Sequence, residues 1–333
     1  MSEAGLQMSL SGQPRISVAL CTYNGEQFLP QQLASIAKQT RLPDEVVVCD
    51  DHSTDRTMAI VREFAATASY PVRVFENERN LGLAANFERA IRLCDGDLIA
   101  LSDQDDIWYP HRLESSEQEF IAHPHAGLVF SDADLVDEHN RLTGQTLWQR
   151  LGFVGKRKRD LLAGQYVVLA KHRFVTGATV MLRATLRDRC LPIGAGWIHD
   201  EWIAMIVAAF GDLRPIDQPL IRYRIHSSQQ VGFVNKLEQR AQGKTRGERH
   251  WERVAESARE LREICDALSA MHLDQGRGVL PAYRRHLQFL CFRSNLPARR
   301  LARLGPALAR YVQYRAHASG LASVLKDLIL KRP

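Results

Sequence analysis

Apolar runs alternate with segments of helical periodicity along the first hundred residues. The runs predicted as strands lie at 15–24, 46–49, 72–78 and 96–103, and the helical segments between them span 25–40, 55–67 and 80–94. Strict alternation of strand and helix predicts an α/β fold on a mostly parallel sheet flanked by helices. Ser53 or Thr54 is expected to cap the second helix, because a hydroxyl can accept from the first free N–H groups.

The pattern loosens after residue 134. It predicts a strand at 125–137, a strand running into a helix at 174–186, an apolar helix opened by acids at 197–211 and a strand at 219–232. From about residue 233 the chain becomes helical and basic. The predicted organisation is therefore a flexible tail at 1–14, an α/β domain at 15–234 and a basic C-terminal helical region at 235–333.

Composition and charge narrow the class of protein. With 333 residues, 45% hydrophobic and 25% charged, the chain suits a folded globular protein. The start lacks the apolar core of a signal peptide, and no window is apolar enough to span a membrane. Six scattered cysteines without metal-ligand spacing favour a reduced, cytoplasmic protein.

The net charge of +6 is unevenly distributed. Residues 284–333 hold eleven Lys or Arg and a single Asp, a net charge of +10, which leaves −4 for the remaining chain. Such a region can bind nucleic acid, anionic lipid or an acidic partner, and charge by itself does not choose among them.

Polar clusters end three of the predicted strands: TYN at 22–24, DDHSTD at 50–55 and SDQDD at 102–106. Ligands of α/β sheets bind at the carboxyl ends of strands, so these groups are expected to meet at one edge. Asp103, Asp105 and Asp106 repel one another unless a cation lies among them. Carboxylate oxygens are suitable ligands for Mg²⁺ or Mn²⁺, so the cluster can be a metal site. The alternative explanation is a solvated turn with no metal. Neither GxGxxG nor GxxxxGK[ST] follows the first strand, which disfavours a dinucleotide fold and a phosphate loop.

Six blocks in order carry a resemblance to a known family. "ISVALCTYNGEQFLPQQLASIAKQT", "VVVCDDHSTDRT", "NERNLGLAANFERAI" and "LSDQDDIWYPHRL" resemble successive blocks of the family 2 glycosyltransferases. "WIHDEW" and "YRIHSSQQVG" resemble the matching blocks of the bacterial rhamnosyltransferase-like members. The resemblance covers roughly residues 15–232 and implies the GT-A fold, a Rossmann-like nucleotide-diphospho-sugar transferase domain.

The resemblance also implies roles for particular residues. Those matching nucleotide-sugar-binding positions are Cys21, Thr22, Tyr23, Asp51, Arg79, Asn80, Asn86 and Asp103. Arg224, beside His226, is expected to bind the donor diphosphate, and a solvated strand edge is the alternative. Those matching metal-binding positions, for Mg²⁺ or Mn²⁺, are Asp103, Asp105 and His226. Simpler explanations are a helix cap for Asp51, an ordinary turn for Asn80, and a surface or packed side chain for His226.

Sugar transfer with inversion requires one base for the acceptor hydroxyl, and a metal to stabilise the leaving diphosphate. Asp200 matches the family's second-acid position and is the candidate base, with Glu201 in reserve; the alternative is an acid favoured at a helix N-terminus. His199 stands where the family usually has Glu, so the choice of acid stays open.

The sequence thus predicts an inverting, metal-dependent hexosyltransferase. It would move a sugar, with L-rhamnose as the first candidate, from a dTDP- or UDP-sugar to a saccharide acceptor. The expected acceptor is a lipid-linked intermediate of a bacterial surface polysaccharide such as O-antigen. The expected location is the cytoplasm, with peripheral contact to the anionic inner face of the membrane through the C-terminal helices. Alternatives are a nucleotidyltransferase, an inactive paralogue that binds nucleotide only, and a nucleic-acid-binding protein using the basic helices.

Overall fold

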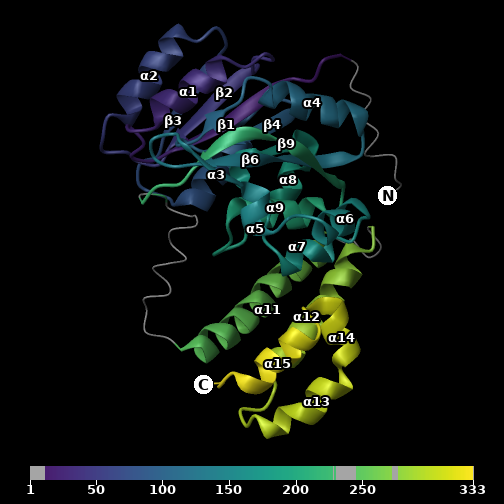
Figure 1. The fold of residues 1–333 in the computed structure, drawn as a ribbon. Coiled ribbons are helices and arrows are strands. Elements are labelled where there is room, and N and C mark those ends of the chain that lie inside the picture. The colour runs from purple at the N-terminus through teal and green to yellow at the C-terminus, as the bar shows by residue number, and fades with distance from the viewer. Residues whose placement is uncertain (1–11, 228, 230–244, 272–276, 333) are drawn as a thin grey trace. The chain divides into compact units, whose positions relative to one another are not determined.

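The computed structural model describes residues 12–227, 229, 245–271 and 277–332 (Figure 1). The chain forms two compact units. The N-terminal unit comprises Met1–Gly164 and Phe174–Gln230, and the C-terminal unit comprises Gln165–Arg173 and Val231–Pro333. Most of the expected tail at 1–14 and the expected boundary at 234/235 lie outside the described residues.

The first half of the N-terminal unit follows the predicted alternation. Its elements are β1 (Ile16–Thr22), α1 (Leu29–Ala37), β2 (Glu45–Asp50), α2 (Thr57–Thr67), β3 (Val72–Glu76), α3 (Leu83–Leu93) and β4 (Leu98–Ser102). Every residue of β1, β2 and β4 is buried, as expected for apolar strands covered on both faces. The four strands pair in parallel in the order β3-β2-β1-β4.

The second half extends the sheet with mixed pairing. Its elements are β5 (Ile107–Trp108), α4 (Arg112–Ala122), β6 (Ala126–Val136), β7 (Leu142–Thr146), α5 (Leu147–Leu151), α6 (Lys156–Leu162), η2 (Gly177–Thr179), β8 (Val180–Arg183), η3 (Ala184–Leu186), α8 (Arg187–Cys190), α9 (His199–Val207) and β9 (Asp212–Arg224). The strand β8 inserts antiparallel between β4 and β6, and β9 lies parallel to β6. All neighbouring strands are therefore parallel from β3 to β4, and the rest of the sheet mixes parallel and antiparallel pairs.

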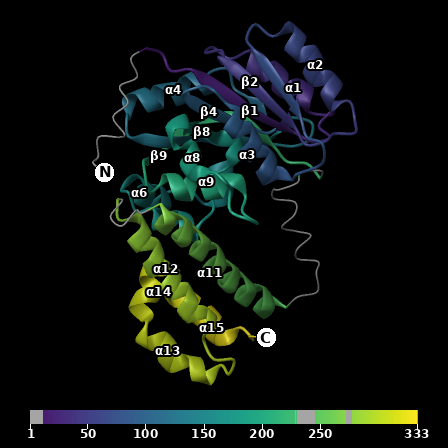
Figure 2. The same cartoon turned by 180° about the vertical axis from the view of Figure 1, so that it is seen from behind.

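Helices cover the two faces of this sheet. Figures 1 and 2 show α1, α2 and α4 on one side and α3 and α9 on the other. The helix α3 packs on β1 and β2 and against α9, which also contacts β6 and β9. This packing brings the N-terminus of α9 close to the sheet.

The capping prediction for the second helix is wrong. Helix α2 begins after Arg56, and the Ser53 hydroxyl instead donates to Asp50 Oδ1 at 2.6 Å. The Thr54 N–H donates to Asn24 Oδ1 at 2.8 Å. Both residues thus hold the loop after β2 rather than the helix, because Asp50 at the end of β2 and Asn24 after β1 are their partners.

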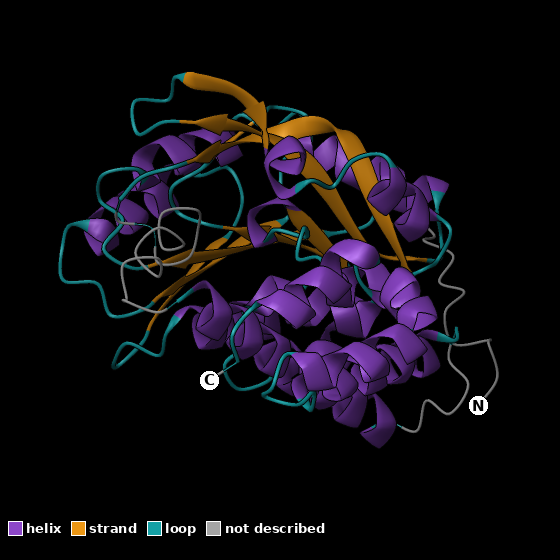
Figure 3. Ribbon diagram, turned by 60° about the horizontal axis from the view of Figure 1, so that its bottom comes forward, coloured by secondary structure: helices purple, strands orange, loops and turns teal. Residues whose placement is uncertain are grey.

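The C-terminal unit is helical, as predicted (Figure 3). Its elements are α7 (Val167–Lys171), α11 (Arg246–Ala270), α12 (Val279–Ser294), η5 (Leu301–Arg303), α13 (Leu304–Ala309), α14 (Tyr311–His317) and α15 (Leu321–Ile329). Phe289, Ala307, Tyr314 and Val324 form a buried cluster among these helices. Among the described helices none combines the length and apolarity needed to cross a membrane.

One buried carboxylate joins four helices of this unit. Asp327 on α15 is fully buried and accepts from the Nε and Nη2 atoms of Arg293 on α12, both at 2.7 Å. It also lies 2.7 Å from His250 Nε2 on α11 and accepts from the Tyr314 hydroxyl on α14 at 2.6 Å. These contacts lower the pKa of Asp327 to about 2 against the opposing effect of burial. The carboxylate is thus a charged centre of this helical unit.

Candidate active site at the carboxyl ends of the strands

The structure brings together the polar segments that follow β1, β2 and β4. Thr22 Oγ1 donates to Asp50 Oδ1 at 2.7 Å, which ties the end of β1 to the end of β2. The side chain of Gln104 hydrogen-bonds to both backbone polar groups of Tyr23. Its Oε1 accepts from the Tyr23 N–H at 2.8 Å, and its Nε2 donates to the Tyr23 carbonyl at 2.9 Å. The expected convergence at one sheet edge is therefore observed. Gln104 was not singled out by the sequence, although it stands between two of the predicted acids.

Asp51 organises the loop after β3. Its carboxylate accepts from the N–H groups of residues 81 and 82 at 2.7 and 2.9 Å, and from Asn77 Nδ2 at 2.8 Å. Asn77 also donates to Asn86 Oδ1 at 2.9 Å, and Asn86 Nδ2 donates to the Cys49 carbonyl at 2.8 Å. These bonds hold Asp51 and the loop in one arrangement. Contact of Asp51 and Asn86 with a nucleotide or sugar stays a prediction.

The other residues predicted to bind nucleotide lie around this edge. Cys21 is buried, and burial raises the pKa of its thiol, so the group behaves as a small apolar side chain. Tyr23 is half-buried, Arg79 is exposed, and Asn80 Nδ2 donates to the Asp51 carbonyl at 3.2 Å. Their positions are compatible with the predicted roles, which remain predictions.

The acidic loop after β4 is crowded with negative charge. Burial, together with the charges of the nearby Asp105 and Asp200, raises the pKa of Asp103 to about 8. Burial also raises the pKa of Asp106, whose Oδ1 accepts from the Arg224 N–H at 3.1 Å. Asp106 Oδ2 is buried without a hydrogen-bond partner within the described residues. A positive charge placed within this loop would therefore be stabilising.

A buried cation, Arg112, lies beneath this loop. Its guanidinium stacks 3.6 Å from the Trp108 ring centre and donates to the Leu101 carbonyl at 2.9 Å. Burial lowers the pKa of Arg112 to about 9, while the charges of Asp106 and Asp103 oppose that change. Sequence reasoning missed this residue, because nothing in the spacing of α4 indicates which side chain turns inward under the acids.

Arg224 connects β9 to the acidic loop. Its Nε donates to the Asp105 carbonyl at 2.8 Å, its Nη1 to the Glu138 carbonyl at 2.9 Å and its Nη2 to Gln31 Oε1 at 2.7 Å. The guanidinium also lies 4.6 Å from the Phe28 ring centre. These contacts fix the backbone of the loop. The predicted contact between Arg224 and the donor diphosphate remains a prediction.

His226 follows Arg224 and contacts the same loop. Its Nε2 lies 2.8 Å from Asp105 Oδ2, and both side chains are largely buried. Within the described part of the chain, however, no three His, Cys, Asp or Glu side chains are arranged to hold a metal ion. The structure thus places the predicted ligands Asp105 and His226 in contact but does not gather them with Asp103 into one ligand set.

Asp200 lies at the start of α9, near the acidic loop. Its Oδ2 accepts from the Gly177 N–H at 2.7 Å, and its Oδ1 accepts from the Glu201 N–H at 2.7 Å. The effect of Asp200 on the pKa of Asp103 places the two carboxylates in one electrostatic neighbourhood. Burial raises the pKa of Tyr223, and the charges of Asp106, Asp103, Asp105 and Asp200 act in the same direction. Which of Asp200 and Glu201 acts as the base is still open.

His199 packs under this helix start. Its ring stacks on Phe87 with centres 3.9 Å apart, and burial lowers its pKa, so the ring is neutral. Neither ring nitrogen has a hydrogen-bond partner among the described residues. A Cβ at Gly177 would overlap His199 Nε2, so only glycine lets the Gly177 N–H approach Asp200 here.

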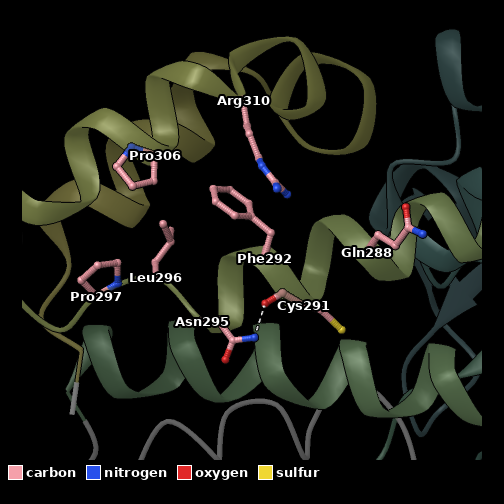
Figure 4. A pocket seen from close by; sticks show the side chains of 8 residues that line it. All are labelled: Gln288, Cys291, Phe292, Asn295, Leu296, Pro297, Pro306 and Arg310. Carbon is pink, nitrogen blue, oxygen red and sulfur yellow. Dashed lines mark hydrogen bonds between the residues drawn. The ribbon is translucent and has the colours of Figure 1, made fainter.

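The C-terminal unit has a groove of a different character, with a volume of about 340 Å³ (Figure 4). It is lined by Phe292 of α12, by Asn295 directly after that helix, and by Pro306 and Arg310 further along the chain. The Arg310 guanidinium lies 4.3 Å from the Phe292 ring centre. The lining contains no carboxylate or imidazole among the described residues, so this groove lacks the predicted chemistry.

Comparisons with known proteins agree with the architecture. Residues 17–177 match Glycosyl transferase family 2. The chain is similar to the dTDP-rhamnosyl transferase RfbG of Shigella flexneri, at 36% identity over 101 residues covering 29% of this chain and 35% of that protein. It is also similar to the UDP-Glc:alpha-D-GlcNAc-diphosphoundecaprenol beta-1,3-glucosyltransferase WfgD of Escherichia coli, at 26% identity over 195 residues covering 57% and 69%. Against two further curated relatives, the match spans about half of their length, 46% and 59%.

The fold has a solved counterpart. The crystal structure of S. aureus TarS residues 1–349 in complex with UDP-GlcNAc superposes with a TM-score of 0.57 at 18% identity, over 94% of this chain and 81% of that one. This likeness confirms the expected GT-A fold with a helical C-terminal region. We conclude that residues 17–177 of the chain form a glycosyl transferase family 2 domain.

Proposed function

We propose that the protein is an inverting, metal-dependent glycosyltransferase that takes its sugar from a dTDP- or UDP-sugar. The observation that carries this proposal is the meeting of Tyr23, Asp51 and the acidic loop at one sheet edge, with Asp200 in the same electrostatic neighbourhood. An enzyme that uses a nucleotide-sugar needs a surface that binds the nucleotide base, acids that bind a metal, and one further carboxylate as the general base. L-Rhamnose is the first candidate sugar, supported by the similarity to RfbG and the rhamnosyltransferase-like blocks.

The acidic loop would hold the metal. Carboxylate oxygens suit Mg²⁺ or Mn²⁺, and the family resemblance adds the imidazole of His226, so Asp103, Asp105 and His226 are the proposed ligands. The orphaned Asp106 Oδ2 and the raised pKa of Asp103 support this assignment, because a bound cation would relieve both. When bound, the metal would neutralise the charge of the departing nucleoside diphosphate.

Asp200 is the proposed general base. Two backbone N–H groups donate to its carboxylate at the start of α9, so its position is fixed near the acidic loop. An ionised carboxylate can accept the proton of the acceptor hydroxyl as that oxygen attacks the anomeric carbon. One base suffices, because a metal-bound diphosphate leaves without being protonated.

The acceptor is proposed to be a saccharide on a lipid diphosphate, in the synthesis of a bacterial surface polysaccharide such as O-antigen. The similarity to WfgD, whose acceptor is alpha-D-GlcNAc-diphosphoundecaprenol, supports this proposal. The enzyme would then work in the cytoplasm at the inner face of the membrane. The charge of +10 on residues 284–333 favours an anionic surface.

A thermal-shift screen of nucleoside diphosphates with and without Mn²⁺ tests donor binding. Ligands that bind the native state raise the melting temperature by mass action. We expect dTDP or UDP to stabilise the protein only when Mn²⁺ is present, and Asp105→Ala to abolish this effect. Indifference to every nucleotide would contradict the proposal.

The base assignment has a separate test. Asp200→Asn is expected to keep metal-dependent donor binding but lose turnover, because the near-isosteric amide cannot accept the proton. Glu201→Gln is the matched variant, at the next position of the same helix, and should keep turnover. The reverse outcome would assign the base to Glu201.

A further inference from the structure

Large apolar side chains gather on the outer surface of the last helices of the C-terminal unit. Among the described residues, eight of the fourteen exposed large hydrophobic side chains lie between Leu301 and Ile329. The most exposed are Leu301 at 90% and Val312 at 79%. So dense a set of exposed apolar side chains marks an interaction surface rather than ordinary surface variation.

These side chains follow helical spacing. On α15, Leu321, Leu325 and Ile329 recur every four residues and are all exposed, whereas Val324 and Asp327 of the same helix are buried. We call these three exposed residues the α15 stripe. Leu301, Leu304 and Leu308 form a second series along η5 and α13. Each helix therefore has one face packed on the unit and another apolar face directed outward.

Basic residues surround the two series without any exposed acid. The exposed cations between residues 299 and 331 are Arg299, Arg300, Arg310, Arg315, Lys326 and Lys331. Asp327, the single acid of residues 284–333, is fully buried and paired with Arg293. Arg310 also lines the groove of Figure 4, where its guanidinium lies beside the Phe292 ring. The surface thus combines apolar side chains with unopposed positive charge.

We propose that the outer surface of η5, α13, α14 and α15 inserts its leucines and isoleucine into an anionic lipid bilayer. Helices that lie in a membrane interface have this composition, with apolar side chains below the headgroups and Arg or Lys among them. A second copy of the chain fits the surface poorly, because it would bring the same positive charge to the interface. The proposal deepens the lipid-linked acceptor of the proposed function, since an enzyme held at the bilayer meets such an acceptor there, but the binding does not require transfer.

Vesicle flotation tests the proposal with the full chain and no donor or acceptor. Phosphatidylcholine vesicles with and without phosphatidylglycerol are compared at low salt and at about 1 M salt, where the screening length is about 3 Å. The wild type should float with the anionic vesicles and retain binding at high salt, because apolar insertion is not screened. Combined Leu321→Gln, Leu325→Gln and Ile329→Gln should weaken binding about tenfold or more, with the larger loss at high salt.

Two control variants separate the contributions. Arg299→Gln with Arg300→Gln should weaken binding at low salt and leave the salt-resistant part. Ile121→Gln with Leu142→Gln removes equally exposed apolar side chains of the N-terminal unit and should leave binding unchanged. Unchanged melting temperatures would show that all variants fold, as expected for exposed positions.

Three results would overturn the proposal. The first is no binding of the wild type to anionic vesicles. The second is equal binding by the wild type and the variant lacking the α15 stripe. The third is a wild-type dimer in sedimentation velocity that the stripe variant converts to monomer, because a second copy would then cover the surface. Failure of vesicle binding would leave donor binding and turnover untouched, so it would not count against the proposed glycosyltransferase.

Discussion

Replacing Gln104 by leucine tests whether one amide couples the acidic loop to the end of β1. The side chain makes two hydrogen bonds to Tyr23, one to its N–H and one to its carbonyl. A hydrogen bond contributes about 1 kcal/mol net, so losing both should lower the free energy of unfolding by about 2 kcal/mol. For a unit of this size that corresponds to a melting temperature about 4–8 °C lower.

The same change should reach the site, because Gln104 lies between Asp103 and Asp105. Without the bonds to Tyr23, the proposed metal ligands of the acidic loop are no longer held at a fixed position relative to the proposed nucleotide-binding residues. We expect metal-dependent nucleotide affinity to fall about tenfold, the equivalent of about 1.4 kcal/mol. Isothermal titration with dTDP or UDP in the presence of Mn²⁺ measures this loss.

The control for this prediction is Gln118→Leu, which makes the same chemical change at an exposed position of α4. It should alter neither the melting temperature nor the nucleotide affinity. Gln104→Glu should be intermediate in stability, since a carboxylate still accepts from the Tyr23 N–H but cannot donate to the carbonyl. The reasoning would be refuted if Gln104→Leu melted and bound nucleotide as the wild type does.

Two further predictions concern buried contacts. Gly177→Ala should lower kcat about tenfold with a smaller change in the donor KM, because the added Cβ displaces the His199 ring and the N–H that holds the proposed base. Gly305→Ala, where the added Cβ meets open space, is the control. An unchanged kcat in Gly177→Ala would contradict the argument. Asp327→Asn should destabilise the C-terminal unit by about 3 kcal/mol at neutral pH, as measured by circular dichroism melts, whereas exposed Asp266→Asn should not. Because the folded pKa of Asp327 is lowered to about 2, its stabilisation is present above about pH 4, the unfolded pKa, and is lost as the pH falls toward 2. A difference between Asp327→Asn and the wild type that persisted at pH 2 would show that the charge is not its cause.

Much of the site could be predicted because its residues follow strands that the apolar pattern identifies. Asp51 and Asp103 stand directly after β2 and β4, and parallel strands deliver their carboxyl ends to one edge. Gln104, Asn77 and Arg112 could not be assigned in this way. Gln104 pairs with Tyr23 and Asn77 with Asp51, which are distant in sequence, and the inward direction of Arg112 depends on how α4 packs against β6 and β9. A glutamine, asparagine or arginine in a loop or helix is ordinary in composition.

The capping error at α2 arises from competition between possible hydrogen-bond partners. Ser53 is a good local cap, but Asp50 and the neighbouring end of β1 compete for the loop and win. Local propensity describes which bonds a residue can make, and the tertiary structure decides which partner is present.

The sequence by itself determined the alternation of strands and helices, the acidic tip of the fourth strand and the separation of a basic helical region, because periodicity and charge are properties of neighbours along the chain. Only the tertiary structure decided that β8 inserts antiparallel beside β4, that Arg112 lies beneath the acids, and that residues 165–173 belong to the C-terminal unit. It also decided which leucines of α15 face outward and which acid of that helix is buried. Such outcomes depend on contacts between residues far apart in sequence, whose energies no local pattern encodes.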